Sequence, residues 1–148
     1  MKSAKDLRYL FIARILYGGG AERFVTTFAS YMAEQGYDVH VLAYDVTEKD
    51  YPLSDKVKLH VMKHVEDNLP GKFLRMSRMI QEQAKIQADV LIPFLGSVEY
   101  CAYLANLLMG KKFVFTLRNS PWKVGGGRFF RLTAKKADAI MLQNREQE

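Results

Sequence analysis

Three consecutive glycines, followed by a glutamate and an arginine, are the residues whose types and spacing most clearly suggest chemistry. Gly18, Gly19 and Gly20 come directly after an apolar run, and Glu22 and Arg23 follow within three residues. Free backbone N–H groups at a glycine turn, together with the dipole of a helix that starts there, attract an anion such as a phosphate. Alternatively, the glycines only form a tight turn between a strand and a helix. The residues leave both interpretations open.

Known nucleotide-binding motifs match this turn poorly. A dinucleotide fingerprint has the pattern G-x-G-x-x-G. Gly18 and Gly20 fit, but Arg23 stands at the third glycine position, where its bulk would obstruct close packing of helix and strand. Asp45 lies about where a dehydrogenase has its ribose-binding carboxylate, which supports a dinucleotide only weakly. A Walker A motif requires Gly-Lys-Ser/Thr after its glycines, and the sequence has none.

The elements that must position the turn alternate between apolar strands and amphipathic helices. The patterns predict strands at 7–16, 37–45, 57–62, 88–96, 111–121 and 137–144, and helices at 21–36, 72–87, 98–109 and about 128–136. Gly36 is expected to end the first helix in a left-handed conformation. This alternation predicts an α/β fold, a Rossmann-like three-layer sandwich with a mainly parallel, doubly wound sheet of about six strands.

Two features of the later helices predict burial. Helix 98–109 is apolar nearly all round, so we expect it to be deeply packed, with Cys101 in the core. The apolar face that runs from Phe73 to Ile86 is also expected to be core. His40 and His60 have no obvious partner in the sequence.

Three loops are expected to converge on one site. Ligands of an open parallel sheet bind beyond the carboxyl ends of the strands, where the strand order reverses. Loops 17–21 and 94–98 would flank that point, and loop 118–122 would lie beside them. These loops contribute the candidate substrate-binding residues Gly18, Gly19, Gly20, Gly96, Ser97, Arg118 and Asn119.

Length, charge and cysteine content exclude several classes of protein. A chain of 148 residues predicts one domain. Its single cysteine and the lack of metal-ligand spacing favour a reducing, cytoplasmic setting without a metal site. The net charge of +6 is compatible with phosphate or membrane attraction, but the lysines form pairs too short for a nucleic-acid tract. No apolar run is long enough to span a bilayer.

The stretch "GGGAERFVTTFASYMAEQGYDVHVLAYD" resembles the opening of retaining glycosyltransferases with the GT-B fold, of the large bacterial group 1 or family 4 type. In that family a first strand leads into Gly-Gly-x-Glu-Arg, an amphipathic helix and then a Gly-x-x-Val strand. The matching residues are Gly19, Gly20, Ala21, Glu22, Arg23, Gly36, Tyr37, Val39 and Val41. The stretch "ADVLIPFLGSVEYCAYLANLLMGKKFVFTLRNSP" has the strand, helix, glycine and strand order of the family.

The resemblance implies two Rossmann-like domains that face each other across a cleft. Residues 1–148 would be the N-terminal, acceptor-binding domain, and the C-terminal donor-binding domain would be absent from this chain. The full enzyme would move a sugar from a nucleotide-sugar to a glycan, polyol-phosphate or lipid-linked acceptor, with retention and no cofactor or obligatory metal. It would serve polysaccharide or cell-envelope synthesis in the cytoplasm, where peripheral contact with the inner face of the membrane is compatible with the resemblance. The isolated domain would be inactive.

The resemblance also gives roles to single residues, although the catalytic residues stay unknown. Gly19 and Gly20 would lie against the donor diphosphate or the acceptor, where a side chain would block approach. Arg118 stands where many relatives have a His, with Asn119 after it. Its guanidinium could bind a phosphate or a sugar hydroxyl, but it could not act as a general base.

Several further candidates have a structural and a functional interpretation. Glu22 suits a helix N-terminus through the helix dipole alone, and Arg23 either pairs within the first turn or faces the cleft. Trp122, Lys123 and Arg128 belong to a stretch that is either a surface loop with a basic helix or an acceptor lid that faces the membrane. The alternative function for the whole chain is a Rossmann domain of the non-catalytic or dehydrogenase type that binds a nucleotide or dinucleotide.

Overall fold

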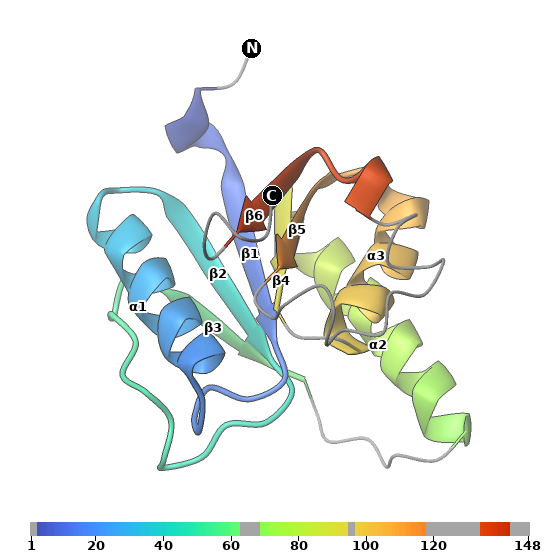
Figure 1. Ribbon diagram of the computed structural model, residues 1–148, viewed down its shortest axis with the longest axis horizontal. Coiled ribbons are helices and arrows are strands. Elements are labelled where there is room, and N and C mark those ends of the chain that lie inside the picture. Colours follow the sequence, from blue (N-terminus) through green and yellow to red (C-terminus); the bar gives the residue numbers. More distant parts are fainter. Residues whose placement is uncertain (1–2, 63–68, 95–96, 118–133, 143–148) are drawn as a thin grey trace.

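The computed structural model describes residues 3–62, 69–94, 97–117 and 134–142, which form a parallel sheet between two layers of helices (Figure 1). The strands are β1 (Arg8–Ala13), β2 (Asp38–Ala43), β3 (Lys58–Val61), β4 (Val90–Pro93), β5 (Lys112–Leu117) and β6 (Ala139–Leu142). The helices are α1 (Gly20–Glu34), α2 (Leu69–Ile86) and α3 (Ser97–Met109), preceded by the short 3-10 helix η1 (Ala4–Asp6). Figure 1 shows α1 on one face of the sheet and α2 and α3 on the other. The predicted doubly wound α/β fold is confirmed.

The strand order places the reversal point beside β1. The six strands run in the order β3-β2-β1-β4-β5-β6, and every neighbouring pair is parallel. The central residue Phe11 is paired with Val41 of β2 on one side and with Ile92 of β4 on the other. The chain therefore adds β2 and β3 in turn on one side of β1. It then crosses over and adds β4, β5 and β6 in turn on the other side. The predicted reversal point between the first and the fourth strand is confirmed.

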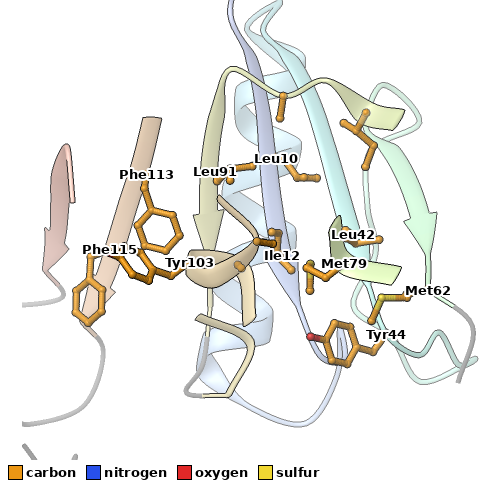
Figure 2. Close-up of a cluster of buried hydrophobic side chains, with 14 residues drawn as sticks. Leu10, Ile12, Leu42, Tyr44, Met62, Met79, Leu91, Tyr103, Phe113 and Phe115 are labelled. Atoms are coloured by element: carbon orange, nitrogen blue, oxygen red, sulfur yellow. The ribbon is translucent and has the colours of Figure 1, made fainter. Parts of the chain in front are cut away.

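Burial on both faces explains why β1 is a continuous apolar run. Leu10 and Ile12 lie in the core beneath α2 and α3, together with Leu42 and Met79 (Figure 2). Phe11 points the other way, toward α1. Its ring meets that of Phe28 edge to face, with centroids 5.9 Å apart, and stacks on Phe94 at 6.2 Å. A strand covered by helices on both faces needs apolar residues at successive positions rather than alternate ones.

The first helix ends as the sequence predicts. Gly36 has a φ of +86°, which an L side chain rarely adopts. Its N–H donates to Ala33 O at 3.0 Å, and the N–H of Tyr37 donates to Met32 O at 3.2 Å. These two bonds are the Schellman arrangement, which satisfies carbonyls at the end of the helix and turns the chain directly into β2.

The burial predicted for the face from Phe73 to Ile86 is confirmed for Met79 and Ile86 but not for Phe73, and the burial predicted for α3 is wrong on one side of that helix. The side chains of Leu107 and Leu108 on α3 are 60% and 76% exposed, and Phe73 on α2 is 73% exposed. α3 packs through Ala102, Tyr103, Ala105 and Asn106, and none of the described residues covers its opposite face. Figure 1 shows that the first turns of α2 extend beyond the ends of the strands. Cys101 is half-buried rather than in the core.

The two histidines of the sheet are partners, contrary to the expectation that neither has one. The rings of His40 and His60 stack with centroids 5.0 Å apart, and His40 Nδ1 lies 2.8 Å from His60 Nε2. His40 Nε2 lies 3.2 Å from Asp38 Oδ1. Burial would raise the pKa of Asp38, but hydrogen bonds from Lys58 and Arg8 outweigh it and lower that pKa to about 2. Burial lowers the pKa of both histidines below the ordinary value.

These lowered pKa values predict a loss of stability on mild acidification. The unfolded chain binds more protons than the folded one around the ordinary histidine pKa of about 6.5, so the free energy of unfolding should fall as the pH drops from about 7.5 to about 5.5. His60→Gln should reduce this slope, as measured by urea unfolding at a series of pH values. Tyr31→His, which places a histidine on an exposed position of α1, should leave the slope unchanged. A wild-type stability that is flat or rises on acidification would contradict this account.

Candidate functional site

The glycine turn lies at the carboxyl end of β1, next to the reversal point. Leu16 is buried and its carbonyl accepts a hydrogen bond from the N–H of Tyr51 at 2.9 Å, which ties the turn to the loop between β2 and β3. Gly18 has a φ of +95°. Gly19 has extended backbone and is the N-cap of α1, and its carbonyl accepts the bond from the N–H of Arg23 at 3.1 Å. The sequence thus changes from strand to helix within a few residues.

The absence of a side chain has a different consequence at each of the three glycines. Gly18 needs its freedom because of its positive φ. A Cβ added to Gly19 would overlap the carboxylate of Glu22, so the missing side chain makes room for that group. A Cβ added to Gly20 would meet nothing within 4 Å. Only Gly20 therefore borders open space without an internal reason to be glycine.

Glu22 folds back over the start of its own helix. It is the third residue of α1 and only 8% exposed. No side chain or backbone N–H among the described residues donates a hydrogen bond to its carboxylate. Its position at the positive end of the helix dipole is favourable for a negative charge. The start of α1 thus already faces a carboxylate, which agrees with the structural role that the sequence suggests.

The side chain of Arg23 lies toward the loop between β2 and β3. The sequence leaves open whether this side chain pairs within the first turn or faces the cleft. In the structure its Cζ atom lies 6.0 Å from the centroid of the Tyr51 ring. This distance allows a cation–π contact with the loop between β2 and β3. Arg23 therefore helps to hold that loop beside the glycine turn.

Tyr44 is a site residue whose role sequence reasoning missed. It follows β2 directly, and its N–H and that of Asp45 donate to Arg14 O at 3.0 and 3.2 Å. Its hydroxyl is buried and has no hydrogen-bond partner in the described part of the chain. Burial raises the pKa of this phenol well above its usual value. The guanidinium of Arg75 lies over the ring, with Cζ 5.7 Å from the centroid.

The position of Tyr44 in the chain could have drawn attention to it. A phenol one residue past a strand, at the carboxyl edge of the sheet, is where a ligand contact is expected. Figure 2 shows Tyr44 at the end of the core cluster, next to Met62 and below Ile12 and Leu42. Tyr44 lies within the predicted strand 37–45, and nothing in the local sequence indicates that its hydroxyl is enclosed.

The second predicted loop is described in part. The N–H of Phe94 donates to Ile12 O at 2.8 Å, which fixes the end of β4 beside β1 at the reversal point. α3 begins at Ser97, one residue earlier than expected, so this residue lies inside the helix rather than before it. The remaining candidates lie outside the described residues, and their roles stay predictions: Gly96, Arg118, Asn119, Trp122, Lys123 and Arg128.

A match to a family model shows which protein family this chain belongs to. The model described as Glycosyltransferase Family 4 matches residues 18–143, which is most of the sequence and begins at the glycine turn. The chain belongs to this family. The predicted resemblance to family 4 glycosyltransferases is confirmed.

One similar protein is described as a glycosyltransferase, and two solved structures share the fold of this chain. A Haemophilus influenzae protein described as an uncharacterized glycosyltransferase is 26% identical over 105 residues, which is 70% of this chain and 30% of that protein. The crystal structure of Acinetobacter baumannii MurG superposes with a TM-score of 0.62 at 13% identity, over 91% of this chain and 41% of MurG. Anabaena HepE, solved in complex with UDP and glucose, gives a TM-score of 0.65 at 14% identity, over 95% and 39%. The family 4 chain thus spans well under half the length of these relatives.

Two further observations concern the described residues. They contain no helix that is both long and apolar enough to cross a membrane. They also contain no group of three or more His, Cys, Asp or Glu side chains placed to hold a metal ion. The candidate site in the described part of the family 4 domain thus consists of a glycine turn, a buried carboxylate and an enclosed phenol.

Because the backbone conformation and the free space differ between Gly18 and Gly20, substitutions at the two positions should change the free energy of unfolding by different amounts. Gly18→Ala forces an L residue to adopt a positive φ and should destabilise the domain by about 1–2 kcal/mol. Gly20→Ala places a methyl group in open space and should change the free energy of unfolding by less than about 0.5 kcal/mol. Urea unfolding of both variants measures the difference. Equal costs at the two positions would contradict the geometry described for the turn.

Proposed function

We propose that this chain is the acceptor-side half of a retaining glycosyltransferase. The whole enzyme would move a sugar from a nucleotide-sugar to a glycan, polyol-phosphate or lipid-linked acceptor. The observation that carries the proposal is the glycine turn of a family 4 member, placed at the carboxyl end of β1 beside the point of strand reversal. Ligands of open parallel sheets bind at that point.

The lengths of the relatives support a second domain. This chain covers 30% of the Haemophilus influenzae protein, 41% of MurG and 39% of HepE. In our proposal the part of the enzyme that this chain does not contain binds the nucleotide-sugar. The chain itself presents the open backbone of Gly20 to the acceptor or to the bound donor. UDP and glucose, which HepE holds in its crystal structure, are suitable first probes.

In this proposal the chain positions the reactants rather than supplying the reacting group. Transfer breaks the bond between the anomeric carbon and the diphosphate, whose oxygen leaves with the bonding electrons. A new bond forms from that carbon to the oxygen of an acceptor hydroxyl, and the departing diphosphate can accept the proton that this hydroxyl loses. Holding the hydroxyl next to the anomeric carbon lowers the entropic part of the barrier. A bare backbone at Gly20 would permit this close approach, because even one methyl group would take up the space.

Substitution of Gly20 tests the proposal in the two-domain enzyme that we propose. Gly20→Val should lower kcat/KM for sugar transfer by about a hundredfold, since a small displacement of reactants has a cost of that order. The fold should be kept, because no atom lies within 4 Å of the added Cβ. The measurement is transfer of radiolabelled sugar from UDP-glucose and other nucleotide-sugars, alongside thermal unfolding.

Two controls make this result decisive. Tyr31→Val places the same side chain on an exposed position of the same helix and should leave transfer unchanged. The 148-residue chain alone should show no turnover. Unchanged kinetics of Gly20→Val, or sugar transfer by the chain alone, would contradict the proposal.

A further inference from the structure

We propose that the outer side of α3, together with the lysines at the amino ends of β5 and β6, docks this protein on a membrane that contains anionic lipids. We call this surface the leucine-lysine face, and it consists of three leucines and four lysines: Leu104, Leu107, Leu108, Lys111, Lys112, Lys135 and Lys136. The proposal goes beyond sugar transfer, because it concerns the surface on which the domain works and not the group that it moves.

The apolar part of the face is a stripe along one side of α3. Leu104, Leu107 and Leu108 are 41%, 60% and 76% exposed. Residues three and four positions apart lie on the same side of a helix, so these side chains are neighbours. Single exposed apolar residues are common on protein surfaces, whereas a contiguous group of them marks a place where another surface binds. The helix packs on the core through its other side, with Ala102 and Ala105.

The end of α3 holds the first two lysines next to this stripe. Gly110 has a φ of +61° and turns the chain out of the helix. The side chain of Asn106 donates from Nδ2 to Lys111 O at 2.8 Å, and its Oδ1 accepts from the N–H of Lys111 at 2.9 Å. Because Asn106 belongs to the last turn of α3, these bonds fix the backbone of Lys111 directly after Leu107 and Leu108.

A second pair of hydrogen bonds brings the other two lysines to the same edge of the sheet. The N–H of Phe113 donates to Asp138 Oδ2 at 2.8 Å, and the N–H of Asp138 donates to Phe113 O at 2.9 Å. Lys112 directly precedes Phe113, and Lys135 and Lys136 shortly precede Asp138, so all three lie where neighbouring parallel strands begin. Figure 1 shows the short red helix of this segment near the end of α3, and the segment packs on the same core cluster as α3.

Charge complementarity favours an anionic bilayer as the partner. The side chains of Lys112, Lys135 and Lys136 are exposed, and that of Lys111 is partly exposed. Even with the carboxylate of Asp138 beside them, four lysines give this face a net positive charge, and the whole chain carries +6. Lysines attract the head groups of anionic lipids, while leucines enter the boundary between head groups and acyl chains. One partner therefore covers the apolar stripe and neutralises the lysines.

A second copy of this chain is the competing partner. Two copies could bury their leucines against each other, but the lysines of one copy would then lie near those of the other. Like charges that face each other oppose such a contact. The position of the face also suits a membrane, because the lysines lie at the amino edge of the parallel sheet and the glycine turn at its carboxyl edge. Docking through this face would leave the turn uncovered.

Co-sedimentation of the 148-residue chain with lipid vesicles tests the proposal. The vesicles contain either phosphatidylcholine alone or an equimolar mixture of phosphatidylcholine and phosphatidylglycerol. The chain should bind the mixed vesicles at least about tenfold more tightly than the neutral ones, and added salt should weaken this binding. The double variant Leu107→Ser with Leu108→Ser should weaken it by about tenfold or more, because burial of two leucines is lost. Lys135→Gln with Lys136→Gln should weaken it by about tenfold and reduce its dependence on salt.

Two double variants serve as matched controls. Phe73→Ser with Leu74→Ser removes two exposed apolar side chains from α2. Lys49→Gln with Lys56→Gln removes two exposed charges from the loop between β2 and β3, and so changes the net charge as much as the lysine variant does. Both controls should bind the mixed vesicles like the wild type. All four variants change exposed side chains, so thermal unfolding should show that each of them folds.

Several results would overturn the proposal. These are equal binding to neutral and mixed vesicles, no binding to either, and unchanged binding by the leucine or lysine variant. Dimerisation in analytical ultracentrifugation that is lost in Leu107→Ser with Leu108→Ser, without vesicle binding, would assign the face to a second copy. Vesicle binding by the chain but not by the two-domain enzyme would show that the rest of the enzyme covers the face. None of these results depends on sugar transfer, so the proposed function is tested separately.

Discussion

The structure depends on the burial of β1 from both sides. Leu10, Phe11 and Ile12 are fully enclosed, with α2 and α3 over one face and α1 over the other. A strand in this position must lie at the centre of the sheet, so β2 and β4 pair with its two edges. The chain adds strands first on the β2 side of β1 and later on the β4 side. The strand order therefore reverses at β1, and the reversal point lies at the carboxyl end of that strand. The glycine turn is located there by the hydrophobic effect before any ligand is considered.

A second constraint acts within the turn itself. α1 must start immediately after β1 in order to cover the Phe11 face of the sheet, and its start brings unpaired N–H groups to the candidate site. Glu22 meets this positive end from inside the helix, and Gly19 gives it the necessary room. The same few residues therefore form the turn and stabilise the start of the helix.

Local signals predicted much of this architecture. The apolar runs gave the strands, and Gly36 marked the end of α1 because its positive φ is a local requirement. Contacts between distant segments have no such local signal. His40 and His60 pair only because β2 and β3 are neighbours in register. The exposure of Leu107 and the enclosure of the Tyr44 hydroxyl likewise depend on how α2 and α3 sit on the sheet. Composition shows that a helix is apolar, but it does not show how much of the helix surface packs against other parts of the protein.

The central claim is that the turn at the carboxyl end of β1 holds a sugar in a glycosyltransferase domain. A crystal structure of the protein with glucose and UDP bound measures this most directly. The account predicts that the sugar lies in van der Waals contact with the backbone of Gly20, in the open space beside that residue. Glucose and UDP bound only away from the carboxyl end of β1 would contradict it.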